Sequence, residues 1–170
     1  RLITVYTLKA GKLKLLAKGT KKPTSKLSGH LQTFTLNNLM IVPSKKGFDY
    51  IGSAFNLKSY LNLKQDLNSL YYTGKIFSFI DRFFQVNQKD KESFLILKNY
   101  LDFLDQHDLS QSSQEKLMFG CMLKIINILA TILDHHFQHI NDGNRDYFKI
   151  YSDHEKVYLF FYEFCKHLEE

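Results

Sequence analysis

The hydrophobic pattern of this chain changes period at about residue 57, and this change limits its possible folds more than any other feature. Before it, short apolar segments alternate with turns about every ten residues, which favours a small antiparallel barrel or sandwich. In one segment, Leu13, Leu15 and Ala17 lie on one side and mostly lysines on the other, as in a half-buried strand. Four strands are predicted, over residues 2–8, 12–18, 34–42 and 48–55.

After residue 57 the apolar residues recur at helical spacing. Four helices are predicted from these positions: Leu63, Leu67, Leu70, Gly74, Phe77 and Phe84; Phe94, Leu97, Leu101 and Leu104; Leu117, Cys121, Ile125, Ile128, Leu129 and Ile132; and Val157, Phe160, Phe161 and Phe164. Asp90 or Ser93 is expected to cap the second helix, and Ser112 or Ser113 the third. The fold class is therefore α+β, with a basic β module over residues 1–58 and an acidic all-helical domain over residues 59–170.

Charge divides the chain at nearly the same place. The net charge is +6, yet residues 1–60 hold eleven Lys and Arg against one acid, Asp49, whereas the remaining residues are net acidic. Such an imbalance indicates a module that binds a polyanion, joined to a domain of a different kind. A lysine-rich surface that only increases solubility is the alternative, although such surfaces usually mix both signs of charge.

Several classes of function have no support in the sequence. The eight glycines form no phosphate-binding or dinucleotide motif, and there is no Gly-x-Ser-x-Gly or Cys-x-x-Cys pattern, so we expect no enzyme activity and no cofactor. No apolar segment approaches the ~18–20 residues of a membrane span, and two cysteines cannot form a framework of several disulfides. The expected location is the reducing cytoplasm.

The histidines allow two interpretations. His136 and His139 have a spacing found in zinc sites, and Cys165 with His167 forms a second pair that would have to converge on them. The alternative, which we favour, is a histidine-rich helix C-terminus, where the helix dipole favours imidazolium. No metal site is therefore predicted.

Beyond these patterns, the N-terminal residues resemble a known family, that of the recombination mediator RecO. The resemblance rests on the order and spacing of several short motifs and continues through the first helices to about residue 105. The motifs are Arg1 to Thr7 (RLITVYT), Gly11 to Lys14 (GKLK), Ala17 to Gly19 (AKG), Ser25 to Leu27 (SKL), Leu31 to Phe34 (LQTF), Tyr71-Tyr72 and Asp81-Arg82.

The resemblance implies an OB-fold barrel followed by a helical domain. It also implies binding of single- and double-stranded DNA, annealing of complementary strands, and help in loading a recombinase onto DNA coated by single-strand-binding protein. The implied partners are RecR and the acidic C-terminal tail of the single-strand-binding protein. For that tail, Arg82, Lys98, Lys116 and Lys124 are candidate contacts or, as we favour, ordinary charges of helix surfaces.

Two departures from the family pattern stand out. The strand pattern begins at Arg1 rather than after a methionine, so we expect a fragment that lacks the family's first strand and has an incomplete barrel. The four-cysteine zinc module of many members is also absent, and His136 and His139 fall roughly where one of its cysteine pairs would be.

The predicted DNA contacts are basic side chains of the β module, which would bind backbone phosphates without reading sequence. They are Arg1, Lys12, Lys14, Lys18, Lys21, Lys22 and Lys26. Tyr6, His30 and Phe34 lie in the same region and either stack on bases or pack in the core, and for each we favour packing. A protein-interaction adaptor and an RNA-binding OB-fold protein are the alternative functions.

Overall fold

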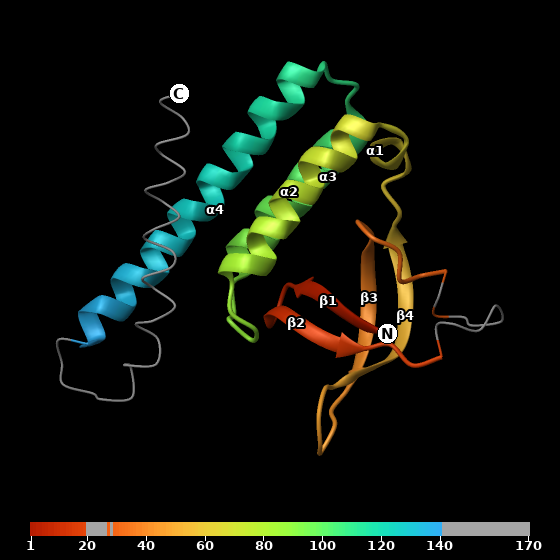
Figure 1. The fold of residues 1–170 in the computed structure, drawn as a ribbon, viewed down its shortest axis with the longest axis vertical. Helices are drawn as coiled ribbons and strands as arrows, with labels where there is room; N and C mark the ends of the chain where they lie inside the picture. Colours follow the sequence, from red (N-terminus) through yellow and green to blue (C-terminus); the bar gives the residue numbers. More distant parts are fainter. Residues whose placement is uncertain (20–26, 28, 141–170) are drawn as a thin grey trace. The chain divides into compact units, whose positions relative to one another are not determined.

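The computed structural model describes residues 1–19, 27 and 29–140, with side chains in the last helix described to Ile132. A sheet comes first in the chain and the helices follow, which confirms the predicted α+β class (Figure 1). The elements are β1 (Leu2–Thr7), β2 (Gly11–Leu16), β3 (Leu36–Val42), β4 (Tyr50–Lys58), α1 (Leu61–Gln65), α2 (Leu67–Phe83), α3 (Lys91–Gln106) and α4 (Gln111–Ile140). The helix predicted around residues 157–164 lies outside the described residues.

Two compact units make up the chain, Arg1–Lys124 and Ile125–Glu170. The first contains the sheet, three helices and the start of α4, and within the second the structure describes the rest of α4. Strand β4 ends at Lys58, and a division of the chain into domains after this residue stays a prediction. None of the described helices is both long and apolar enough to cross a membrane.

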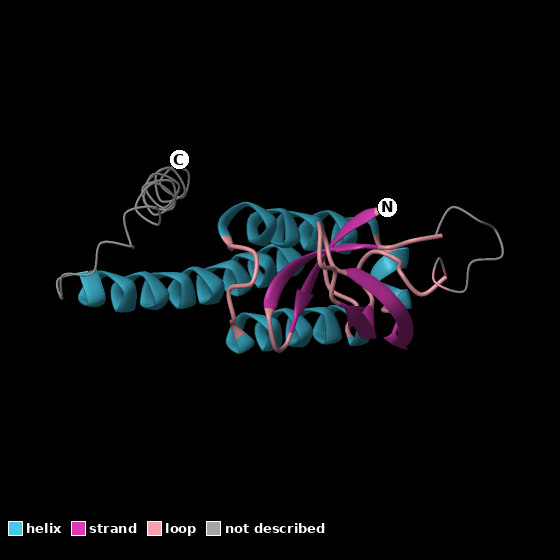
Figure 2. Cartoon of the chain, turned by 90° about the horizontal axis from the view of Figure 1, so that it is seen from below, coloured by secondary structure: helices cyan, strands magenta, loops and turns pink. Residues whose placement is uncertain are grey.

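The sheet is built from two antiparallel hairpins, in the order β1-β2-β4-β3, and it is strongly curved (Figure 2). The hairpins meet where Leu16 of β2 pairs in parallel with Tyr50 of β4. The inner face holds a cluster of buried apolar residues: Leu15, Ala17, Leu31 and Ile51. The alternation predicted for residues 12–18 therefore assigns Leu15 and Ala17 to the core correctly, because strand side chains alternate between the two faces.

The connection between α2 and α3 lies directly against the turn of the β1–β2 hairpin. The Asn87 N–H donates to the Lys12 carbonyl oxygen at 2.8 Å, and Lys12 pairs with Val86 in an isolated bridge. Gly11 has a φ of +67°, and a Cβ atom at this position would lie 1.8 Å from the Gln88 carbonyl oxygen. Only glycine fits here, because the position combines left-handed backbone with close approach of a second backbone segment.

Tyr6 fastens the same connection to β1. Its ring meets that of Phe84 edge to face at 5.6 Å between centroids, and its hydroxyl donates to the Asp90 carboxylate at 3.1 Å. The other oxygen of Asp90 accepts from the Ser93 N–H at 3.0 Å and caps α3, as the sequence predicted. One buried carboxylate therefore begins a helix and holds it to the sheet.

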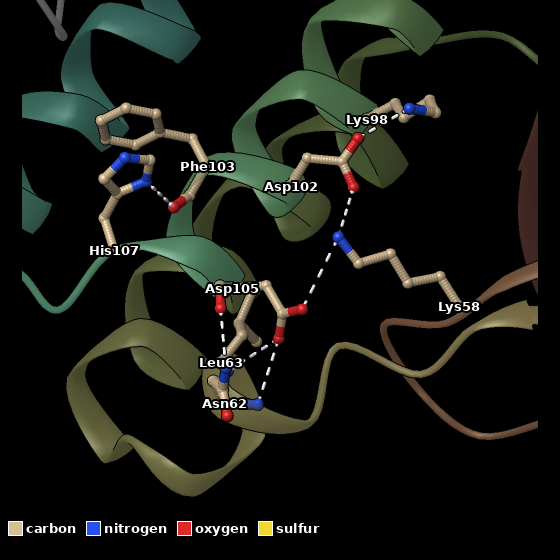
Figure 3. Close-up of polar contacts among 8 residues, drawn as sticks. All are labelled: Lys58, Asn62, Leu63, Lys98, Asp102, Phe103, Asp105 and His107. Atoms are coloured by element: carbon tan, nitrogen blue, oxygen red, sulfur yellow. Dashed lines mark hydrogen bonds and ion pairs between the residues drawn. The ribbon is translucent and has the colours of Figure 1, made fainter.

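Where β4 leaves the sheet, carboxylates of α3 hold it in place (Figure 3). The Lys58 ammonium lies 2.8 Å from one oxygen of Asp102, whose other oxygen is 2.6 Å from the ammonium of Lys98. Burial would raise the pKa of Asp102, but the hydrogen bonds from these two lysines outweigh it and hold that pKa below its ordinary value. The carboxyl is therefore ionised and shared between two cations.

Asp105, one turn further along α3, caps the short helix α1 from a distance. The residue before α1 is Tyr60, which has a φ of +51° and supplies no side-chain cap. In its place, the Asp105 carboxylate accepts from the backbone N–H groups of Asn62 at 3.1 Å and Leu63 at 3.3 Å (Figure 3). The N–H groups that open a helix need such an acceptor, and α3 provides it here.

Replacing Gly11 by Ala is expected to destabilise the protein more than the same change at Gly47. Both glycines have positive φ, which costs an alanine about 1–2 kcal/mol. Only at Gly11 does the added Cβ also meet backbone, whereas at Gly47 nothing lies within 4 Å. Urea unfolding of both variants measures the difference, and equal free energies of unfolding would contradict the close contact with Gln88.

Asp102→Asn is expected to lower the free energy of unfolding at pH 7 by about 1 kcal/mol, a modest value because the groups are partly exposed. A carboxyl with a lowered pKa stabilises the fold above its unfolded-state pKa, about 3.9, and stops doing so as the pH falls through its lower folded-state value. The difference between variant and parent should therefore shrink below about pH 4. Unfolding measured between pH 3 and 7 tests this, with the exposed Asp108→Asn as control.

Candidate nucleic-acid interface

Two of the predicted lysines are exposed: Lys14 on the outer face of β2, and Lys18 two residues beyond the end of that strand. Lys14 lies on the side opposite the core residue Leu15, because side chains alternate along a strand. The Lys18 ammonium sits 4.2 Å from the centre of the Tyr50 ring, on the neighbouring strand β4. This face therefore presents cations beside an aromatic ring.

Lys12 does not belong to the exposed face, and the expectation that it lies there is wrong. It is only 5% exposed, and its ammonium donates to the Asp81 carbonyl oxygen at 2.6 Å. The Asp81 carboxylate is further away, at 3.6 Å. Because Asp81 lies in the last turn of α2, the ammonium satisfies a carbonyl at the negative end of the helix dipole. Lys12 therefore has a structural contact.

Arg1 is exposed and lies next to the end of β2. The Arg1 carbonyl oxygen accepts from the Ala17 N–H at 2.8 Å, so the backbone of Arg1 lies beside the residue that precedes Lys18. The predicted contacts Lys21, Lys22 and Lys26 lie outside the described residues. The structure thus brings together three of the seven predicted residues: Arg1, Lys14 and Lys18.

Two further lysines, Lys45 and Lys46, were not among the predicted contacts. They lie exposed in the turn between β3 and β4, which the sequence analysis treated only as a connection. They belong to the acid-poor first third of the chain, and this charge pattern could have identified them. Among the residues that the structure describes, no carboxylate lies within 4.0 Å of Lys14, Lys18, Lys45 or Lys46.

Tyr6 and Phe34, two of the side chains considered for base stacking, pack against other aromatic rings. Tyr6 contacts Phe84 and Asp90, as described above, and Phe34 packs on Phe77 with 5.2 Å between ring centroids. His30 is half-buried. Packing, the favoured interpretation for these residues, is confirmed for Tyr6 and Phe34 by these contacts.

The histidines considered for zinc cannot be placed, because the side chains of His136 and His139, as well as Cys165 and His167, lie outside the described ones. Within the described part of the chain, no group of three or more His, Cys, Asp and Glu side chains is arranged to hold a metal. Cys121 is buried in α4, as predicted, and burial raises the pKa of its thiol to about 12.

This geometry defines the class of protein: a curved β module with an exposed basic face, fastened by Lys12 and Lys58 to the helices that follow it. Comparison with known proteins gives the same order of parts. The family model for the N-terminal part of recombination protein O, an OB-fold domain, matches residues 1–60.

Curated relatives extend the match into the helices. The DNA repair protein RecO of Caldicellulosiruptor bescii is 30% identical over 104 residues, which cover 61% of this chain and 42% of the relative. That of Geobacter sulfurreducens is 27% identical over 114 residues, covering 67% and 46%. That of Acaryochloris marina is 40% identical over 70 residues, covering 41% and 24%.

These comparisons support the resemblance to the RecO family that the sequence motifs indicated. The chain spans less than half the length of these relatives.

Lys12→Met is expected to lower the free energy of unfolding by about 1–3 kcal/mol, because the Asp81 carbonyl oxygen at the end of α2 loses its charged donor. Lys14→Met, on the same strand, should change it by less than about 0.5 kcal/mol, since Lys14 is exposed. Thermal or urea unfolding measures both. Equal stabilities of the two variants would contradict a structural role for Lys12.

Proposed function

We propose that this chain is the DNA-binding part of a recombination mediator that acts in DNA repair. The observation that supports this most is a coincidence of position: the family match covers residues 1–60, and the same residues carry eleven basic residues and one acid. Within them, four described lysines are exposed and lack a carboxylate partner among the described residues. A module with free cations in this family binds a polyanion.

In this proposal the lysine ammonium groups contact backbone phosphates of single- and double-stranded DNA. Lys14 lies on β2 and Lys18 in the turn that follows it, so they can contact different phosphates. Arg1 extends the same surface, and the sequence adds Lys21, Lys22 and Lys26 in the segment that follows β2. Contacts of this kind release counterions and carry no base information, so binding is tolerant of sequence and weakens with salt.

Annealing follows from the same contacts. Two complementary strands repel each other through their phosphates, and a surface of unpaired ammonium groups lowers that repulsion on both. The base edges remain free to pair, because phosphate contacts position DNA without covering its bases. The protein then needs no catalytic group, and we assign it none.

The remaining parts of the proposal come from the family. We propose that the chain assists recombinase loading in the cytoplasm, on DNA coated by single-strand-binding protein, with RecR and the acidic tail of that protein as partners. Of the helix cations considered for the tail, Lys98 is already paired with Asp102, which favours its interpretation as an ordinary helix charge.

A titration of fluorescently labelled single-stranded DNA at several salt concentrations tests the proposal. Four to six engaged cations should give a log–log salt slope of about −3 to −4, at roughly −0.7 per phosphate neutralised. Replacing Lys21, Lys22 and Lys26 together by Glu should abolish most binding without unfolding the protein. Replacing Lys91, Lys116 and Lys124 by Glu, which are all exposed on helices, is the matched control with the same change of charge and should leave the slope unchanged.

No binding at low salt would overturn the proposal and favour the adaptor, in which the lysines only increase solubility. Tighter binding of RNA than of DNA of the same sequence would favour the RNA-binding alternative. Acceleration of strand annealing by the parent chain, and its loss in the triple-Glu variant, would join binding to the proposed activity.

A further inference from the structure

The turn between β3 and β4, residues 43–49, combines two cations with an exposed aromatic ring. Lys45 and Lys46 are both exposed, and 53% of Phe48 remains accessible to solvent. An aromatic side chain that is this exposed has not gained the stabilisation that burial would give it. The turn therefore holds unused apolar surface directly beside positive charge.

The turn is ordered by contacts of its own. The Asp49 carboxylate accepts from the Ser44 N–H at 2.9 Å across the turn, and the Ser44 hydroxyl donates to the Lys46 carbonyl oxygen at 2.8 Å. Gly47 has a φ of +87°, which lets the chain reverse. Asp49, the single acid of the first 60 residues, therefore accepts a hydrogen bond inside the turn.

The C-terminal end of the turn is joined to β2. The Leu16 N–H donates to the Asp49 carbonyl oxygen at 2.8 Å, and Leu16 pairs with Tyr50, whose ring lies beneath the Lys18 ammonium. Asp49, the last residue of the turn, and Tyr50 therefore connect the turn to the chain segment that carries Lys18. A polyanion bound along β2 would reach the turn next.

From this arrangement we infer that the turn is a contact for unpaired bases: Phe48 stacks on a base of single-stranded DNA, while Lys45 and Lys46 bind the flanking phosphates. Stacking on an aromatic side chain is possible for any base, which agrees with sequence-tolerant binding. It requires a base whose face is free, and bases inside a duplex are already stacked on their neighbours. The turn therefore distinguishes single strands from duplexes, which phosphate contacts alone do not.

This inference rests on the proposed function and adds to it a specific preference. The carboxylates of an acidic peptide would also meet the two lysines, but an acidic side chain offers no flat ring to Phe48. A nucleotide with an unpaired base offers a phosphate to the lysines and a flat ring to Phe48, so we assign the turn to single-stranded DNA.

The test compares Phe48→Ala, Phe48→Trp and the parent chain in titrations of labelled oligodeoxythymidine and of a duplex of equal length. Phe48→Ala should weaken single-strand binding about 5- to 100-fold, the range for loss of one stacked base, with no change of salt slope. Phe48→Trp should retain it, and duplex binding should be the same in all three proteins. Replacing Lys45 and Lys46 by Gln should instead make the salt slope shallower by about 1.4.

Tyr71→Ala and Phe55→Ala are the matched controls. Tyr71 is 56% exposed on α2, and Phe55 is 66% exposed near the other end of β4. Neither change should alter binding. Loss through Phe55→Ala in place of Phe48→Ala would move base stacking to the sheet face and overturn the role of the turn.

The two hypotheses fail differently. If the parent binds DNA with the expected salt slope and Phe48→Ala does not weaken single-strand binding, the inference is wrong and the proposed function stands. Equal weakening of single-strand and duplex binding would also overturn it, because the turn would then contact only the backbone. If the parent binds neither probe at low salt, both are wrong.

Discussion

The buried ammonium group of Lys12 determines how the sheet meets the helices. A charge that is 5% exposed must have partners, and its closest is the Asp81 carbonyl oxygen in the last turn of α2. Helix α2 must therefore end above this strand, and the chain continues across the hairpin turn at Gly11, where a side chain would not fit. Because α2 covers one end of the outer face of β2, it leaves Lys14 and Lys18 at the other end exposed. The same contact thus orders the fold and limits the basic face.

Acidic side chains of α2 and α3 pair with lysines of the basic β module and so help it to fold. Lys12 and Lys58 meet Asp81, Asp102 and Asp105 of α2 and α3, while no described carboxylate pairs with the lysines of the outer face and the β3–β4 turn. Ion pairs that are partly exposed contribute little to stability, about 0–1 kcal/mol each. These ion pairs instead fix where the β module contacts the helices, since they form only at that junction. The separation of charge along the sequence therefore becomes a separation in space, with joined lysines on one side and unpaired lysines on the other.

Local pattern predicted much of this fold, and contacts between distant segments account for what it missed. Alternation assigned Leu15 and Ala17 to the core correctly, since parity is a property of the strand itself. It could not reveal the burial of Lys12, which depends on a helix end 69 residues later. The apolar spacing around Leu63 and Leu67 predicted one helix, but the structure has two, separated at Asp66. The Asp66 carboxylate caps α2 and accepts a hydrogen bond from the Gln114 side chain of α4. Helix α4 begins at Gln111, before the predicted caps Ser112 and Ser113, because the Ser110 hydroxyl accepts from the Ser113 N–H in its first turn.

The proposed binding surface shows the same limit, with a consequence for mechanism. The sequence identified lysines by their number, but not that the β3–β4 turn is joined to the end of β2, because that connection depends on the pairing of Leu16 with Tyr50 on two distant strands. Phosphate contacts depend on counterion release and weaken steeply with salt, whereas stacking on an aromatic ring does not involve ions. A surface with both kinds of contact would keep its stacking contribution to single-strand binding as salt rises, because only the phosphate contacts weaken. A protein that anneals DNA benefits from this difference, because the duplex it forms loses the stacking contact and is released while unpaired strands stay bound.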